Sequence, residues 1–182
     1  MVKTGIDVIA TLALLGNIAL AVLLILFLAQ MFFNNKLLKK LVAFLEPKNY
    51  FLVFFLSLTA TLASLFLSEI VKFDPCVLCW YQRIAMYPQP LLLYMAIVRN
   101  EKTLTPYLIA MNAIGGLIAV YHYSLHLFPN ALPAGCDLSV SGVSCVKGYS
   151  FYYGFMTFPY MALTVFVLNI ILLSFSYYKK RR

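Results

Sequence analysis

The sequence predicts an all-α integral membrane protein, and three observations support this class. Only 11% of the 182 residues are charged, whereas a soluble domain carries about 25%. Hydrophobic residues make up 63% of the chain. Several uncharged runs exceed the roughly 20 apolar residues that a helix needs to cross the hydrocarbon layer. These runs do not alternate between apolar and polar residues, which excludes membrane-spanning strands.

Five helices are expected, in order, at 7–33, 50–71, 79–98, 106–128 and 151–177. Runs 8–35, 49–68, 103–136 and 148–178 contain no Lys, Arg, Asp or Glu, and the third helix carries only Arg83. The first run exceeds the roughly 7–15 residues of a signal-peptide core, so we predict a retained span. Segment 36–48 places lysines opposite an apolar face, which predicts an interfacial helix. A solvated extension of the first span is the alternative.

The basic residues predict the orientation of the chain in the membrane. Lys and Arg concentrate in short cytoplasmic loops. Ten of the 14 basic residues fall on the side of the C-terminus, in segments 36–48, 99–102 and 179–182. Only Lys3, Lys72 and Lys147 fall on the opposite side. We therefore expect an outer N-terminus and a cytoplasmic C-terminus. The net charge of +8 therefore reflects the topology of the chain. No nucleic-acid partner is expected, because the basic residues of this chain are not gathered on one solvated face.

All four cysteines are predicted to lie on the outer side. Cys76 and Cys79 form a C-x-x-C motif between the second and third helices, and Cys136 and Cys145 lie in loop 129–150. Three interpretations compete: structural disulfides, a four-cysteine zinc site, and redox-active pairs. Disulfides persist on the oxidising side of a membrane. The loop spacing is long for a zinc knuckle, so no metal site is expected.

The residues around the C-x-x-C motif favour the redox interpretation. Cys79 is placed at the start of a helix, where the helix dipole stabilises a thiolate. Arg83 follows four residues later on the same helical face and adds positive charge. A thiol of low pKa is a good leaving group in disulfide exchange. The alternative for Arg83 is a side chain that only reaches to the outer interface.

The two histidines, His122 and His126, are four residues apart and therefore share a face of the fourth helix. Two histidines alone make a poor metal site. The alternative to a chemical role is a hydrogen bond from either ring to a backbone carbonyl. In the same helix, Gly115 and Gly116 predict close packing against a neighbouring helix.

The motif F-D-P-C-V-L-C-W-Y-Q-R at 73–83, followed by Tyr87 and Pro88, resembles the disulfide bond formation protein B (DsbB) family, in particular its BdbC-like branch. The resemblance covers roughly 50–178 and includes the 120–122 stretch and the loop cysteines. It implies a DsbB-like four-helix membrane domain at 49–178. An extra N-terminal helix (1–35), a basic interfacial segment (36–48) and a basic cytoplasmic tail (179–182) complete the expected organisation.

The resemblance implies a thiol:quinone oxidoreductase of the bacterial cytoplasmic membrane. Such an enzyme reoxidises a soluble, DsbA-like thioredoxin-fold oxidase and passes the electrons to ubiquinone or menaquinone, so that exported proteins acquire disulfides. The vitamin K epoxide reductase family also combines a C-x-x-C motif with a loop pair of cysteines. In that family the motif follows the loop pair along the chain, whereas here it precedes the pair, which favours the DsbB-like interpretation. The alternative is a protein without enzymatic activity, a scaffold in which the disulfides only stabilise the outer loops.

The resemblance also implies a role for each site residue. Cys136 would be attacked by the partner, and Cys145 would pass the electrons on to the Cys76–Cys79 disulfide. Cys79 would contact the quinone ring. Two further residues are the expected quinone contacts: Arg83, and more weakly His122.

Overall fold

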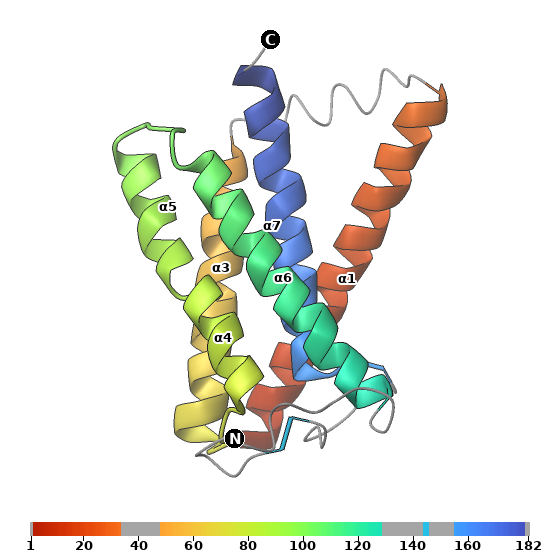
Figure 1. Ribbon diagram of the computed structural model, residues 1–182, viewed down its shortest axis with the longest axis vertical. Helices are drawn as coiled ribbons and strands as arrows, with labels where there is room; N and C mark the ends of the chain where they lie inside the picture. Colours follow the sequence, from red (N-terminus) through yellow and green to blue (C-terminus); the bar gives the residue numbers. More distant parts are fainter. Residues whose placement is uncertain (1, 34–47, 129–143, 146–154, 181–182) are drawn as a thin grey trace.

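The computed structural model describes residues 2–33, 48–128, 144–145 and 155–180. Its elements are α1 (Val2–Phe33), α3 (Asn49–Leu65), η2 (Phe66–Ile70), α4 (Val77–Met86), α5 (Pro88–Val98), α6 (Thr105–Leu127) and α7 (Phe158–Lys180). Figure 1 shows these helices running between two ends of an elongated bundle. One end carries the N-terminus and the start of α4, and the opposite end carries the C-terminus and the α5–α6 connection.

The fold class is confirmed as an all-α membrane bundle. Three of the described helices are long and apolar enough to cross a membrane: Thr4–Val22, Asn49–Ile70 and Thr105–Leu127. A shorter apolar helix spans Phe158–Ser174. The predicted interfacial segment 36–48 lies outside the described residues except for Lys48.

The predicted single helix at 79–98 is wrong in one respect, because the structure divides it into α4 and α5 at Tyr87. Pro88 is the first residue of α5 and Pro90 follows two positions later. Proline lacks an N–H donor and clashes with the preceding turn, so it begins a helix more readily than it continues one. The chain bends here, and α4 is separately oriented at the end that carries the C-x-x-C motif (Figure 1).

Helices α6 and α7 pack closely at a glycine. A Cβ atom built on Gly115 would lie 2.4 Å from Cζ of Phe166, whose side chain is fully buried. The Phe166 ring therefore occupies the space that a side chain at Gly115 would need. At Gly116 the nearest atom, Cβ of Phe166, would be at an ordinary 3.7 Å. The predicted close packing is confirmed, and Gly115 is the residue that allows it.

Four fully buried polar side chains connect α3, α5, α6 and α7 inside the bundle. Asn112 donates to Oε1 of Gln89 at 2.9 Å, and Asn169 donates to Oγ of Ser57 at 3.0 Å and to Oδ1 of Asn112 at 3.2 Å. Polar bonds between membrane helices contribute about 0.6–2 kcal/mol each. This layer fixes the relative positions of these four helices, one of which, α6, carries His122.

The additional helix α1 packs against α7. Gly16 faces Thr164 and Leu168, and the Thr164 hydroxyl donates to Oδ1 of Asn17 at 3.1 Å. Ala10 is buried in a cluster with Met156 and Met161, whereas Leu15 and Ile18 are exposed. The helix therefore lies beside the bundle, in contact with it along one face.

Candidate active site

The C-x-x-C motif is positioned by the turn that ends η2. Lys72, two residues after the end of η2, adopts a left-handed conformation (φ 62°), and the non-helical segment 73–76 follows it. Cys76 is the N-cap residue of α4, with φ −69° and ψ 171°. Cys79 lies in the first turn of that helix, so its predicted place at a helix start is confirmed.

The two sulfur atoms of the motif lie close together. The Sγ atoms of Cys76 and Cys79 are 3.3 Å apart, and both residues are free thiols. Cys76 is buried and Cys79 is half-buried. One thiol thus faces the interior of the bundle while its neighbour is closer to the surface.

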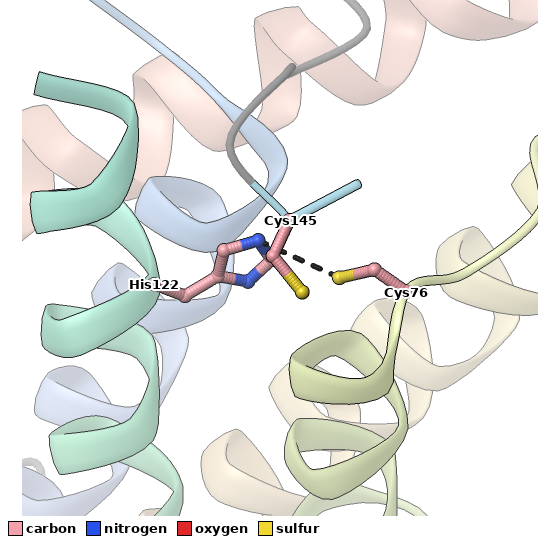
Figure 2. Close-up of side chains that lie close together, drawn as sticks. All are labelled: Cys76, His122 and Cys145. Carbon is pink, nitrogen blue, oxygen red and sulfur yellow. Dashed lines mark hydrogen bonds between the residues drawn. The ribbon is translucent and has the colours of Figure 1, made fainter. Parts of the chain in front are cut away.

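His122 lies beside Cys76 and is held from its other side by Gln82. Its Nε2 is 3.6 Å from Sγ of Cys76 (Figure 2), and its Nδ1 is 3.0 Å from Nε2 of Gln82. His122 and Gln82 are both buried. The histidine therefore bridges α6 and α4 at the C-x-x-C motif.

Cys145 completes the cluster. One side-chain atom from each of Cys76, His122 and Cys145 lies within 4.8 Å of the others, and all three residues are buried (Figure 2). Cys145 is disulfide-bonded, whereas Cys76 is free. Cys136 lies outside the described residues. A thiol is therefore held close to a disulfide sulfur, which is the arrangement that thiol–disulfide exchange needs.

The same three residues are also soft metal ligands. A cysteine binds metal as a thiolate, and the sulfur of Cys145 is engaged in a disulfide. In this oxidation state the cluster is better suited to exchange of sulfur bonds than to coordination.

The neighbours of Cys76 lower the pKa of its thiol to about 4. The hydrogen bond with Cys79 is the largest cause, and burial opposes it by disfavouring the charged form. The hydrogen bond and charge of His122 lower the pKa further. The sequence predicts a stabilised thiolate at the motif, at Cys79, and the structure adds His122 of α6 as a further stabilising neighbour on the Cys76 side.

Arg83 points toward α3. Its Nη2 donates to the carbonyl oxygen of Ser64 at 3.3 Å, and its guanidinium lies 5.3 Å from the ring centre of Trp80 and 5.9 Å from that of Tyr87. Its positive charge also interacts with the Cys79 thiol. Arg83 is thus fixed by neighbouring residues, with a cation close to the outer cysteine of the motif.

An apolar cavity of about 320 Å³ runs between α4 and α6, lined by Tyr81, Ile84, Ala85, Met111, Ile114 and Ile118. Ile118 also packs against the cluster formed by Cys76, Leu78, Leu125 and Cys145. Small-molecule sites are typically concave and mostly apolar, from about 300 Å³ upward. Tyr81, Ile84 and Ile114 are each more than half exposed, so this is an open apolar groove on the surface of the bundle.

One contributor to the site was not predicted. Gln82 was not singled out, although a buried amide in an apolar helix requires a partner. His126 hydrogen-bonds the backbone of Cys145, as the structural alternative for either histidine expected, and its ring centre lies 5.0 Å from that of His122. Only the contact between helices identifies the role of Gln82.

The fold and the site together define an all-α membrane protein with a C-x-x-C pair next to a disulfide-bonded cysteine. The sequence model of the family "Disulfide bond formation protein DsbB" matches residues 47–175. The chain belongs to this family, and its role is in disulfide bond formation.

Named relatives are consistent with this membership. The chain is 42% identical over 122 residues to the SPbeta prophage-derived disulfide bond formation protein B of Bacillus subtilis (strain 168), covering 66% of this chain and 80% of the relative. It is 44% identical over 115 residues to disulfide bond formation protein C of the same organism, covering 63% and 82%. A probable disulfide formation protein C 1 of Bacillus cereus is 42% identical over 111 residues, covering 61% and 78%. No solved structure matches the chain.

Proposed function

We propose that the chain is a thiol:quinone oxidoreductase that reoxidises a soluble, DsbA-like thioredoxin-fold oxidase outside the cytoplasmic membrane. The observation that carries this proposal is the approach of Cys145 to Cys76. A disulfide-bonded sulfur and a free thiol of low pKa lie within 4.8 Å of each other. A structural brace needs no such pairing, because its disulfides stay closed.

The electrons would pass through three exchanges. A partner thiolate attacks Cys136, so that the loop disulfide is reduced and the partner leaves oxidised. Cys145 then attacks Cys76 of the closed C-x-x-C disulfide, and Cys136 resolves the Cys145–Cys76 bond. The loop disulfide reforms and the C-x-x-C motif is left as two thiols.

The reduced motif then requires an electron acceptor. A membrane quinone, ubiquinone or menaquinone, supplies this chemistry by accepting two electrons and two protons. Cys79 is suited to deliver the electrons because it is the more exposed thiol of the pair. Arg83 would orient and polarise the acceptor through its N–H donors. The apolar cavity next to Ile118 would hold the hydrophobic part.

The proposed oxidoreductase is tested by following quinone absorbance. Purified protein in detergent is mixed with a reduced thioredoxin-fold oxidase and a quinone. The wild-type chain should reduce the quinone catalytically, and Cys79→Ser should reduce turnover at least about 10³-fold because the step has lost its electron-donating thiolate. Retained turnover in Cys79→Ser, or none in the wild type, would contradict the proposal.

The order of the loop cysteines has its own test. With Cys145→Ser, the mixed disulfide between the partner and Cys136 cannot be resolved by Cys145 and should accumulate. Mass spectrometry of the trapped complex identifies the bonded cysteine. A complex that forms only in Cys136→Ser, through Cys145, would reverse the two roles.

A further inference from the structure

His122 differs from an ordinary buried histidine because both ring nitrogens face functional partners. The side chain is only 2% exposed. Its Nδ1 is 3.0 Å from the amide nitrogen of Gln82, and its Nε2 is 3.6 Å from Sγ of Cys76. Neither contact is the backbone carbonyl expected for a structural histidine. Figure 2 shows the ring lying between α6 and the sulfur of Cys76.

The Gln82 contact determines which nitrogen carries the proton. The Gln82 amide N–H donates to Nδ1, so Nδ1 accepts and the proton of the neutral ring is on Nε2. That N–H points at Cys76, where it can donate to a sulfur anion. A hydrogen bond to a charged group is about twice as strong as one between neutral groups.

We propose that His122, oriented by Gln82, is a catalytic residue of the internal exchange, donating a hydrogen bond that stabilises the Cys76 thiolate as it leaves Cys145. This proposal rests on the proposed function and deepens it. It assigns His122 to the cysteine relay, whereas the resemblance made it a candidate quinone contact. Gln82 is a positioning residue, because it acts only through the imidazole.

The step balances within the chain. The Cys136 thiolate attacks Sγ of Cys145, a Cys136–Cys145 bond forms, and the Cys145–Cys76 bond breaks. The electron pair of the broken bond goes to the Cys76 sulfur, which accepts the hydrogen bond from Nε2 of His122. Two electrons thus reach the C-x-x-C motif without any external oxidant.

The position of His122 also distinguishes the two cysteines of the motif. Its hydrogen bond is to Cys76, the buried thiol, while Cys79 is half-buried and interacts with the charge of Arg83. Stabilising a thiolate at Cys76 favours attack and departure at that sulfur. Cys79 is thereby the cysteine that passes electrons to the quinone. The exchange should then favour the state with electrons on the C-x-x-C motif.

The test separates the internal exchange from quinone reduction in the full-length protein. A single turnover with reduced partner and no quinone is quenched in acid, thiols are alkylated, and peptides report which cysteines are free. With His122→Phe, the Cys145–Cys76 species should accumulate, and its resolution should slow by about tenfold to a hundredfold, the effect of one hydrogen bond to a charged group. Protein reduced beforehand with dithiothreitol enters the quinone step directly, and His122→Phe should slow this step less than it slows resolution of the Cys145–Cys76 species.

Gln82 provides a graded variant. Gln82→Glu places a carboxylate against Nδ1. A carboxylate can only accept, so the neutral ring then carries its proton on Nδ1 and Nε2 can no longer donate to Cys76. Resolution should therefore slow as the pH rises, while the wild type keeps its rate. Gln82→Leu, which leaves the proton free to stay on Nε2, should slow resolution less. Besides Cys76, the groups beside the ring are His126 and the disulfide-bonded Cys145. Cys79 contacts Cys76, and Arg83 acts on Cys79. None of these residues is altered in the variants. Ser124→Ala is the control, because its hydroxyl bonds only Val120 of its own helix among the described contacts.

Each outcome has a definite meaning. Normal resolution in His122→Phe together with slow quinone reduction would overturn the proposal and make His122 a quinone contact. An identical pH profile for wild type and Gln82→Glu would also overturn it. If the wild type itself transfers no electrons to quinone while the internal exchange proceeds normally, the proposed function fails and the role of His122 in the exchange stands. Thermal unfolding of each variant excludes loss of fold as the cause.

Discussion

At the scale of single residues, the chemistry depends on the unequal environments of two neighbouring thiols. Cys76 is buried between Cys79 and His122, and these neighbours lower its pKa to about 4. An ordinary cysteine has a pKa of about 8.5. The reduced protein should therefore hold a thiolate at the motif in the neutral range, stabilised at Cys76 by Cys79 and His122.

Alkylation of Cys76 in the reduced protein should show this directly. Only a thiolate reacts with iodoacetamide, so the wild-type rate should change little between about pH 5.5 and about pH 8. In Cys79→Ala the main cause of the lowered pKa is removed, so the rate should fall by about tenfold for each unit of pH below 8. Peptide mass spectrometry follows Cys76 alone. A wild-type rate that falls in the same way would contradict the lowered pKa.

Much of the site at this scale was accessible to sequence reasoning, and its missing parts share a cause. The cysteine spacing, the helix start at Cys79 and the cation at Arg83 are local properties that a motif carries. Gln82 meets His122 across 40 residues, and no pattern within one helix shows that contact. The same limit hides the contact between His122 and Cys76, since the neighbours of Cys76 come from α6 as well as α4.

At the scale of helices, the contact between α6 and α7 depends on the absence of one side chain. Gly115→Ala places a Cβ atom 2.4 Å from the Phe166 ring. The fully buried ring has to move, and overpacking of this kind costs about 1–3 kcal/mol. We expect a lower melting temperature in detergent, measured by thiol-reactive fluorescence or circular dichroism.

Gly116→Ala is a matched control. The added Cβ would lie 3.7 Å from Phe166, so this substitution should change the melting temperature little. The double variant Gly115→Ala with Phe166→Leu should recover part of the loss, since the smaller side chain leaves room for the added methyl group. Equal effects of the two glycine substitutions would show that helix propensity, and not packing, determines the result.

Helix lengths and breaks were predicted with unequal success for a physical reason. Uncharged runs identify where a span is possible, because charge is costly in hydrocarbon. They do not show where the backbone changes geometry inside an apolar run. The division at Tyr87 and the π-helical end of α3 at 66–70 occur where apolarity is uninterrupted. Pro88 and Pro90 were the available signal for the first of these.

At the scale of the whole molecule, the arrangement of the chain ends agrees with the charge asymmetry of the sequence. The start of α4, which carries Cys76 and Cys79, lies at the same end of the bundle as the N-terminus (Figure 1). The α5–α6 connection, with Arg99 and Lys102, lies at the other end with the C-terminus. Because positively charged loops stay in the cytoplasm, the cysteine end should face outward, where an exported partner can reach it.

Single-cysteine labelling in intact cells tests this orientation. In a variant with all four native cysteines replaced by serine, Asp74→Cys lies in the exposed segment before α4, and Glu101→Cys lies in the exposed α5–α6 connection. A membrane-impermeant maleimide should label Asp74→Cys in whole cells and Glu101→Cys only after the membrane is opened. The two variants control for each other, because both positions are exposed and differ only in the end of the bundle that carries them. Labelling of Glu101→Cys in whole cells, with Asp74→Cys protected, would invert the topology. The cysteine relay would then face the reducing cytoplasm, where a reoxidised partner could not supply disulfides to exported proteins.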